Sequence, residues 1–137
     1  MTLVIDASVA LKWVLDEPGS DAAFALQGDD LFAPALWLLE SANALWIRVQ
    51  RGPFDADWAD RRLKELVEAP VKTTPVEMDV EAALGLAAAL RHPVYDCLYL
   101  ACALRLGGQV VTADKGFLRA TSARPDLADR VRLLGAP

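Results

Sequence analysis

The chain has 137 residues, close to the ~150 residues of one typical domain. Apolar residues make up 54% of it, which excludes a disordered chain, a collagen-like repeat and an all-β sandwich. Fourteen basic and 19 acidic residues give a net charge of −5, the wrong sign for a non-specific nucleic-acid clamp. Any nucleic-acid partner must therefore be bound by a local basic surface.

Strand-like and helix-like segments alternate along the chain. In order, the patterns predict a strand at 3–5, helices at 9–14 and 20–27, a strand at 31–33, helices at 34–51 and 55–69, a strand at 71–73, helices at 74–90 and 93–106, a strand at 109–112, a helix from 115 and a strand at 131–133. Pro34 suits the first turn of its helix. Thr74 to Glu77 reads as a capping box that opens the helix after it.

This alternation predicts an α/β fold with a short central parallel sheet and helices on both of its faces. No repeat, low-complexity segment or long linker divides the sequence, so residues 1–137 are expected to form one domain.

Nothing in the sequence indicates export or membrane insertion. The N-terminal segment has no basic start, and Asp6 interrupts its apolar run, so it does not read as a signal peptide. The longest uncharged runs, 31–39 and 82–90, have nine residues, far below the ~20 that span a bilayer. Two cysteines without a CxxC spacing indicate no disulfide scaffold. We expect a soluble, cytoplasmic protein without a membrane partner.

Four acidic residues fall where a parallel sheet would gather them. Asp6 and Asp114 each follow a predicted strand, and Asp96 lies in the first turn of a helix. Each of these three positions is also explained by helix capping or by the helix dipole. Glu40 is harder to explain, because almost all its helical neighbours are apolar and a buried carboxylate without a partner is costly. Asn43 shares its helix face and is a candidate hydrogen-bond partner.

Together the four acids predict a metal site. Ligands of open parallel sheets bind beyond the carboxyl ends of the strands, where Asp6 and Asp114 lie and where the helix that carries Asp96 can begin. Converging carboxylates repel one another unless a cation lies among them, and all-oxygen ligation favours Mg²⁺ or Mn²⁺.

Four segments resemble the motifs of PIN-domain ribonucleases: VIDASV, ESANAL, YDCLYLA and VTADKGF, in this order. The chain length and motif order are similar to those of the VapC toxins of toxin–antitoxin pairs. The resemblance implies a PIN-like nuclease domain that acts as a metal-dependent endoribonuclease. The family's metal-binding acids correspond here to Asp6, Glu40, Asp96 and Asp114, and its polar positions near the metal to Ser8, Asn43 and Thr112. A further acid that some relatives carry is replaced here by Gly116.

The resemblance also implies partners. These are an RNA substrate, either tRNA or ribosomal RNA, and a cognate antitoxin protein of a type II system. A homodimer is expected as well, because four tryptophans exceed what a small core needs and aromatic residues are enriched at interfaces. The basic residues that flank the expected site in sequence, and are candidates for RNA binding, are Lys12, Lys115, Arg119 and Arg124.

Other readings fit the sequence less well. A phosphatase of the haloacid dehalogenase type needs a second Asp two residues after the first, where this chain has Ser8. A mechanism of the RNase A type needs paired acid–base groups such as two histidines, but His92 is the only one, and we expect no catalytic role for it. The remaining alternative is a catalytically inert PIN-like binding or regulatory protein.

Overall fold

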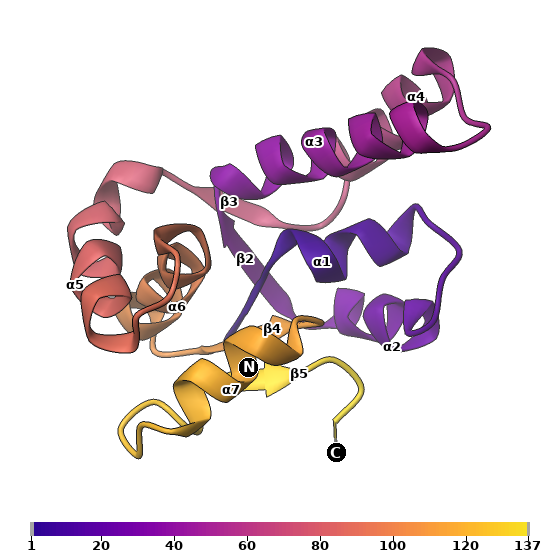
Figure 1. The fold of residues 1–137 in the computed structure, drawn as a ribbon. Coiled ribbons are helices and arrows are strands. Elements are labelled where there is room, and N and C mark those ends of the chain that lie inside the picture. The colour runs from indigo at the N-terminus through magenta and orange to yellow at the C-terminus, as the bar shows by residue number, and fades with distance from the viewer. Residues whose placement is uncertain (1, 137) are drawn as a thin grey trace.

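Five short parallel strands form the centre of the molecule (Figure 1). The computed structural model describes residues 2–136. The strands lie in the order β3-β2-β1-β4-β5. Their bounds are β1 Thr2–Ile5, β2 Asp30–Pro34, β3 Lys72–Thr74, β4 Gln109–Thr112 and β5 Val131–Leu133. The parallel sheet that the sequence predicts is confirmed.

Helices connect successive strands and cover the sheet. Their bounds are α1 Ala7–Ala10, α2 Ser20–Ala25, α3 Leu36–Arg51, α4 Ala56–Val67, α5 Val80–Leu90, α6 Val94–Leu106 and α7 Lys115–Ser122, with 3₁₀ turns η1 Leu11–Trp13, η2 Leu26–Gly28 and η3 Val76–Met78. Helix α6 packs on β1, β2 and β4, and α5 packs on α6. Helices α3 and α4 form an antiparallel pair that extends from the body of the molecule (Figure 1).

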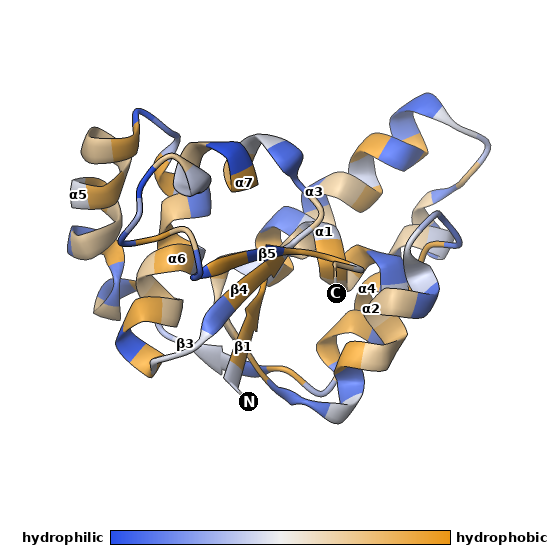
Figure 2. Cartoon of the chain, turned by 90° about the horizontal axis from the view of Figure 1, so that it is seen from below, coloured by the Kyte–Doolittle hydropathy of each residue, from blue (hydrophilic) through white to orange (hydrophobic). Residues whose placement is uncertain are grey.

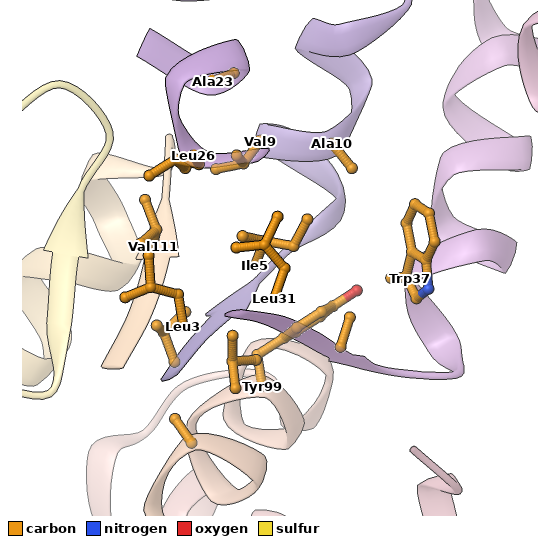
Figure 3. Close-up of a cluster of buried hydrophobic side chains, with 14 of the residues drawn as sticks. Leu3, Ile5, Val9, Ala10, Ala23, Leu26, Leu31, Trp37, Tyr99 and Val111 are labelled. Atoms are coloured by element: carbon orange, nitrogen blue, oxygen red, sulfur yellow. The ribbon is translucent and has the colours of Figure 1, made fainter. Parts of the chain in front are cut away.

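The core lies on both sides of β1. Leu3, Val4 and Ile5 are all almost completely buried, as expected for a central parallel strand. Figure 3 shows Val9 and Leu26 on one side of the sheet and Tyr99 of α6 on the other. In Figure 2, β1 and β4 are coloured mostly hydrophobic, and so is much of α5. Within residues 2–136, no helix combines the length and apolar character that crossing a membrane requires.

Two predicted helix starts are wrong, because the backbone there belongs to the sheet. Pro34 is the last residue of β2, and α3 begins at Leu36 instead of in a turn around Pro34. Thr74 pairs with Pro34 as the end of β3, and its carbonyl accepts a hydrogen bond from the Ala35 N–H at 2.9 Å. Thr74 therefore does not cap a helix, and η3 separates it from α5.

An ion pair fixes the start of α5 against α6. Asp79, which precedes α5, is 2% exposed and accepts hydrogen bonds from Nε and an Nη of Arg105 at 2.7 and 3.0 Å. The sequence marks Asp79 only as an acid near a helix N-terminus. Its burial depends on the arginine that α6 places 26 residues later.

Candidate active site

The candidate site lies where the strand order changes direction. The chain proceeds from β1 outward to β2 and β3 and then returns to the opposite side of β1 for β4. In such sheets this position forms a crevice at the carboxyl ends of the strands. Asp6 follows the end of β1 and Thr112 ends β4, so these two residues meet there.

Hydroxyl groups hold the Asp6 carboxylate between the two strand ends. Thr112 Oγ1 donates to Oδ2 and Ser8 Oγ donates to Oδ1, both at 2.5 Å. Ser8 Oγ also accepts the Ala113 N–H at 3.0 Å, which ties the start of α1 to the end of β4. Ser8 and Thr112, which the resemblance implies to be polar residues near the metal, therefore both contact Asp6.

Burial makes the Asp6 charge costly. The side chain caps α1 by accepting the Val9 N–H at 3.3 Å, yet the residue is only 6% exposed. Desolvation raises the Asp6 pKa to about 6, against the opposing effect of its three hydrogen bonds. The negative charge of Asp96 makes a smaller contribution to this rise. Within residues 2–136 no Lys or Arg forms an ion pair with Asp6.

Glu40 is half-buried rather than enclosed, and a tyrosine is its partner. The Tyr99 hydroxyl donates to Glu40 Oε1 at 2.5 Å. Figure 3 shows the Tyr99 hydroxyl pointing from α6 toward the side of α3 on which Trp37 lies. Burial raises the Glu40 pKa, the Tyr99 hydrogen bond lowers it and the charge of Asp96 raises it again.

Asp96 connects the other two acids electrostatically. It lies in the first turn of α6, and its charge raises the pKa of both Asp6 and Glu40. Three carboxylates from the end of β1, from α3 and from α6 therefore share one electrostatic environment. The group that contacts Asp96 is His92, whose Nε2 lies 2.6 Å from Asp96 Oδ2.

Asp114 lies at the same edge but is engaged locally. Its Oδ1 caps α7 by accepting the Gly116 N–H at 2.8 Å, and its side chain is exposed. Its own N–H donates to Thr112 Oγ1 at 3.0 Å, the hydroxyl that holds Asp6. The acid whose charge raises the pKa of Asp6 and Glu40 is Asp96.

Asn43 shares a cavity with Glu40 without bonding to it. Both residues line a cavity of about 340 Å³ beside α3, together with Leu39 and Tyr95. Among residues 2–136 the Asn43 amide makes no hydrogen bond with the Glu40 carboxylate. Asn43 is exposed, so its amide is accessible from solvent beside Glu40.

The four candidate RNA-binding residues divide into two pairs. Lys12 Nζ contacts Glu17 Oε1 at 3.1 Å and the Pro18 carbonyl at 2.8 Å. Arg124 contacts both carboxylate oxygens of Asp126 at 3.1 Å. The other two candidates, Lys115 and Arg119, are exposed and form no ion pair in the part of the chain that the structure describes.

Sequence reasoning assigned no role to two residues of this site. Tyr99 is one turn after Asp96, and the spacing shows that both lie on one helix face, but not that Tyr99 reaches a carboxylate 59 positions earlier. His92 is four positions before Asp96, and this short spacing was the available signal.

The donor set fits a hard divalent cation. Asp6, Glu40 and Asp96 offer carboxylate oxygens, which Mg²⁺ and Mn²⁺ prefer. The charge of Asp96 acts unfavourably on the charged forms of Asp6 and Glu40, and a bound cation would offset it. Across residues 2–136, no three His, Cys, Asp or Glu side chains are close enough to form a ready-made chelate. Because Mg²⁺ usually keeps several water ligands and is held by one or two carboxylates, the three acids need not all contact it directly.

Comparison with known proteins gives consistent results. The PIN domain family model matches residues 3–122. The chain is 37% identical over 120 residues to Ribonuclease VapC3 of Pyrobaculum aerophilum, which covers 84% of this chain and 91% of the relative. The crystal structure of PAE2754 from Pyrobaculum aerophilum superimposes with a TM-score of 0.69 at 24% identity, covering 88% of this chain and 79% of that one, and so has the same fold. The chain belongs to the PIN domain family.

Proposed function

We propose that this protein is a metal-dependent endoribonuclease that hydrolyses RNA phosphodiester bonds and acts as the toxin of a type II toxin–antitoxin pair. The observation that supports the proposal most strongly is the group of three acids at the strand crossover: the charge of Asp96 raises the pKa of both Asp6 and Glu40, and within residues 2–136 no Lys or Arg forms an ion pair with any of the three. The similarity to Ribonuclease VapC3 supports RNA as the substrate.

In this proposal Asp6, Glu40 and Asp96 hold Mg²⁺ or Mn²⁺. The ion, when bound, supplies Lewis acidity for an attacking water and offsets charge on the phosphate. Ser8 and Thr112 keep the Asp6 carboxylate at the crevice, and Tyr99 keeps Glu40 turned toward it. Asp114 joins the site if its carboxylate exchanges the α7 cap for the cation.

RNA binding is assigned first to Lys115 and Arg119, because both are exposed next to the end of β4. Lys12 and Arg124 would have to exchange their present ion pairs for phosphate contacts. Asn43 adds a polar group beside Glu40. The RNA would be a tRNA or a ribosomal RNA, the protein partner an antitoxin, and the site of action the cytoplasm.

Cleavage by acid-to-amide variants tests this proposal. RNA is incubated with Mn²⁺ and with wild-type protein, Glu40→Gln or Asp96→Asn, and products are separated on a denaturing gel. We expect wild-type protein to cleave and both variants to lose at least 100-fold in rate. Asp21→Asn, which changes an exposed acid outside the site, should cleave like wild type. Equal cleavage by Asp96→Asn would contradict the assignment, and absence of cleavage by wild type would favour an inert binding protein.

A further inference from the structure

We propose that His92 is a positioning residue for Asp96: its imidazole fixes one carboxylate oxygen so that the other remains available to a divalent cation. The inference rests on the proposed function, because it assigns Asp96 to a metal site. Nε2 of His92 and Oδ2 of Asp96 are 2.6 Å apart. An ionised carboxylate can only accept a hydrogen bond, so Nε2 carries the hydrogen and donates it.

The start of α6 explains why Asp96 needs this donor. Pro93 is the N-cap and Asp96 the third residue of the helix. In a capping box the side chain at this third position, a Glu or Gln, accepts the N–H of the N-cap residue. Proline has no N–H, so the usual donor is missing. His92, one residue earlier, is the donor to Asp96 within residues 2–136.

The imidazole is itself held in place. The backbone N–H of His92 donates to the Ala87 carbonyl at 3.2 Å and so closes the end of α5. Arg91, just before it, adopts a left-handed conformation with φ 53°. For a residue other than glycine this conformation is unfavourable and persists where its surroundings fix it. The His92 ring packs on the Phe117 ring of α7, with centroids 5.3 Å apart, and Phe117 is 1% exposed.

Burial distinguishes this pair from the ordinary surface pairs of the chain. The His92 and Asp96 side chains are 17% and 27% exposed, whereas Lys64 and Asp60, which have the same i,i+4 spacing, are 73% and 56% exposed. The charge of Asp96 also reaches Asp6 and Glu40. The hydrogen bond therefore acts on a carboxylate of the candidate site and not on a solvated helix face.

Because His92 already holds the Asp96 carboxylate, the Asp96 side chain loses less conformational freedom when a cation binds. Groups that hydrogen-bond to metal ligands typically change metal affinity or activity by about 10–100-fold when they are removed. We therefore expect loss of the His92 donor to weaken Mn²⁺ binding by at least about 10-fold.

Two substitutions separate the hydrogen bond from the packing. His92→Phe keeps a ring against Phe117 but removes the donor, and His92→Gln keeps a side-chain N–H but loses the ring. Lys64→Met removes a donor from the exposed pair with Asp60 as a matched control. Mn²⁺ affinity of the full chain is measured by titration calorimetry, and melting in EDTA shows whether each variant is folded.

We expect Lys64→Met to bind Mn²⁺ like wild type, His92→Phe to bind at least about 10-fold more weakly, and His92→Gln to recover most of the loss. If wild type binds Mn²⁺ and His92→Phe binds within twofold of it, the inference is wrong and the metal site stands. Equal weakening in His92→Gln and His92→Phe would also overturn it, because ring packing would then be what matters. Absence of Mn²⁺ binding by wild type would overturn both the inference and the proposed function.

Discussion

The pKa of Asp6 is set by two opposing effects: burial of the carboxylate raises it and hydrogen bonds to the carboxylate lower it. Asp6 closes the first turn of α1 and accepts hydroxyl hydrogen bonds from Ser8 of α1 and from Thr112 at the end of β4, although it is almost completely buried. Burial raises its pKa from 3.8 to about 6 in the folded protein. The folded state therefore binds a proton more tightly than the unfolded chain does.

This shift predicts how stability depends on pH without metal. Below pH 3.8 the carboxyl is protonated in both states and causes no penalty. Between pH 3.8 and about 6 the folded state holds more protons, so stability falls as pH rises. Above pH 6 the full penalty of about 3 kcal/mol is present.

Asp6→Asn should therefore melt higher than wild type in EDTA at pH 8 and lose its advantage at pH 4. An amide at this position can keep accepting from Ser8 and Val9 through its oxygen, while the Thr112 hydroxyl can turn to accept from its nitrogen. Melting curves across this pH range test the prediction, with Asp16→Asn as an exposed-acid control. A lower melting temperature for Asp6→Asn at pH 8 would show that the hydrogen bonds outweigh the buried charge.

The Tyr99 hydroxyl has a separate role at Glu40. Tyr99→Phe removes the donor that lowers the Glu40 pKa, so that pKa should rise and Mn²⁺ affinity should fall by about 10-fold. Tyr95→Phe is the matched control, since Tyr95 lies on the same helix but is 60% exposed. Mn²⁺ titrations of the two variants provide the comparison, and equal affinities would mean that Tyr99 does not position Glu40.

At the scale of elements, the Asp79–Arg105 pair holds α5 against α6. Arg105→Met leaves a buried carboxylate without a partner and should destabilise the protein by about 3 kcal/mol. Asp79→Ala should cost less, because Arg105 is 30% exposed and can turn to water. Lys72→Met, which removes a surface pair with Asp30, should change little. Urea unfolding measures all three, and similar values for Arg105→Met and Lys72→Met would contradict this account.

Local sequence patterns predict the central strands of this sheet but not the pairing of β2 with β3. The sequence predicts β1 and β4 correctly, because each is a short apolar run that ends at a polar residue, Asp6 after β1 and Thr112 in β4. Since the strands are parallel, it also predicts that these two ends lie at the same edge of the sheet. The roles of Pro34 and Thr74 were misjudged, since helix-start signals are local and the pairing of β2 with β3 is not. The Tyr99–Glu40 bond likewise depends on how α6 packs, whereas the His92–Asp96 spacing was visible in the sequence.

At the scale of the whole molecule, exposed apolar side chains beside the site bear on the expected homodimer. Leu39 and Tyr95 are 69% and 60% exposed and line the cavity next to Glu40. If this surface forms the dimer, Leu39→Ser should shift the protein toward the monomer in light scattering after gel filtration. Leu84→Ser, at a similarly exposed leucine of α5, should not. A wild-type protein that stays monomeric at high concentration would contradict the homodimer.

We propose that this chain cleaves RNA with a divalent cation held by Asp6, Glu40 and Asp96. The most direct measurement is the cleavage rate of one RNA by the same preparation in EDTA and after Mn²⁺ or Mg²⁺ is restored. We expect no cleavage in EDTA and recovery with either ion. Cleavage at the same rate in EDTA, or none with either ion, would contradict it.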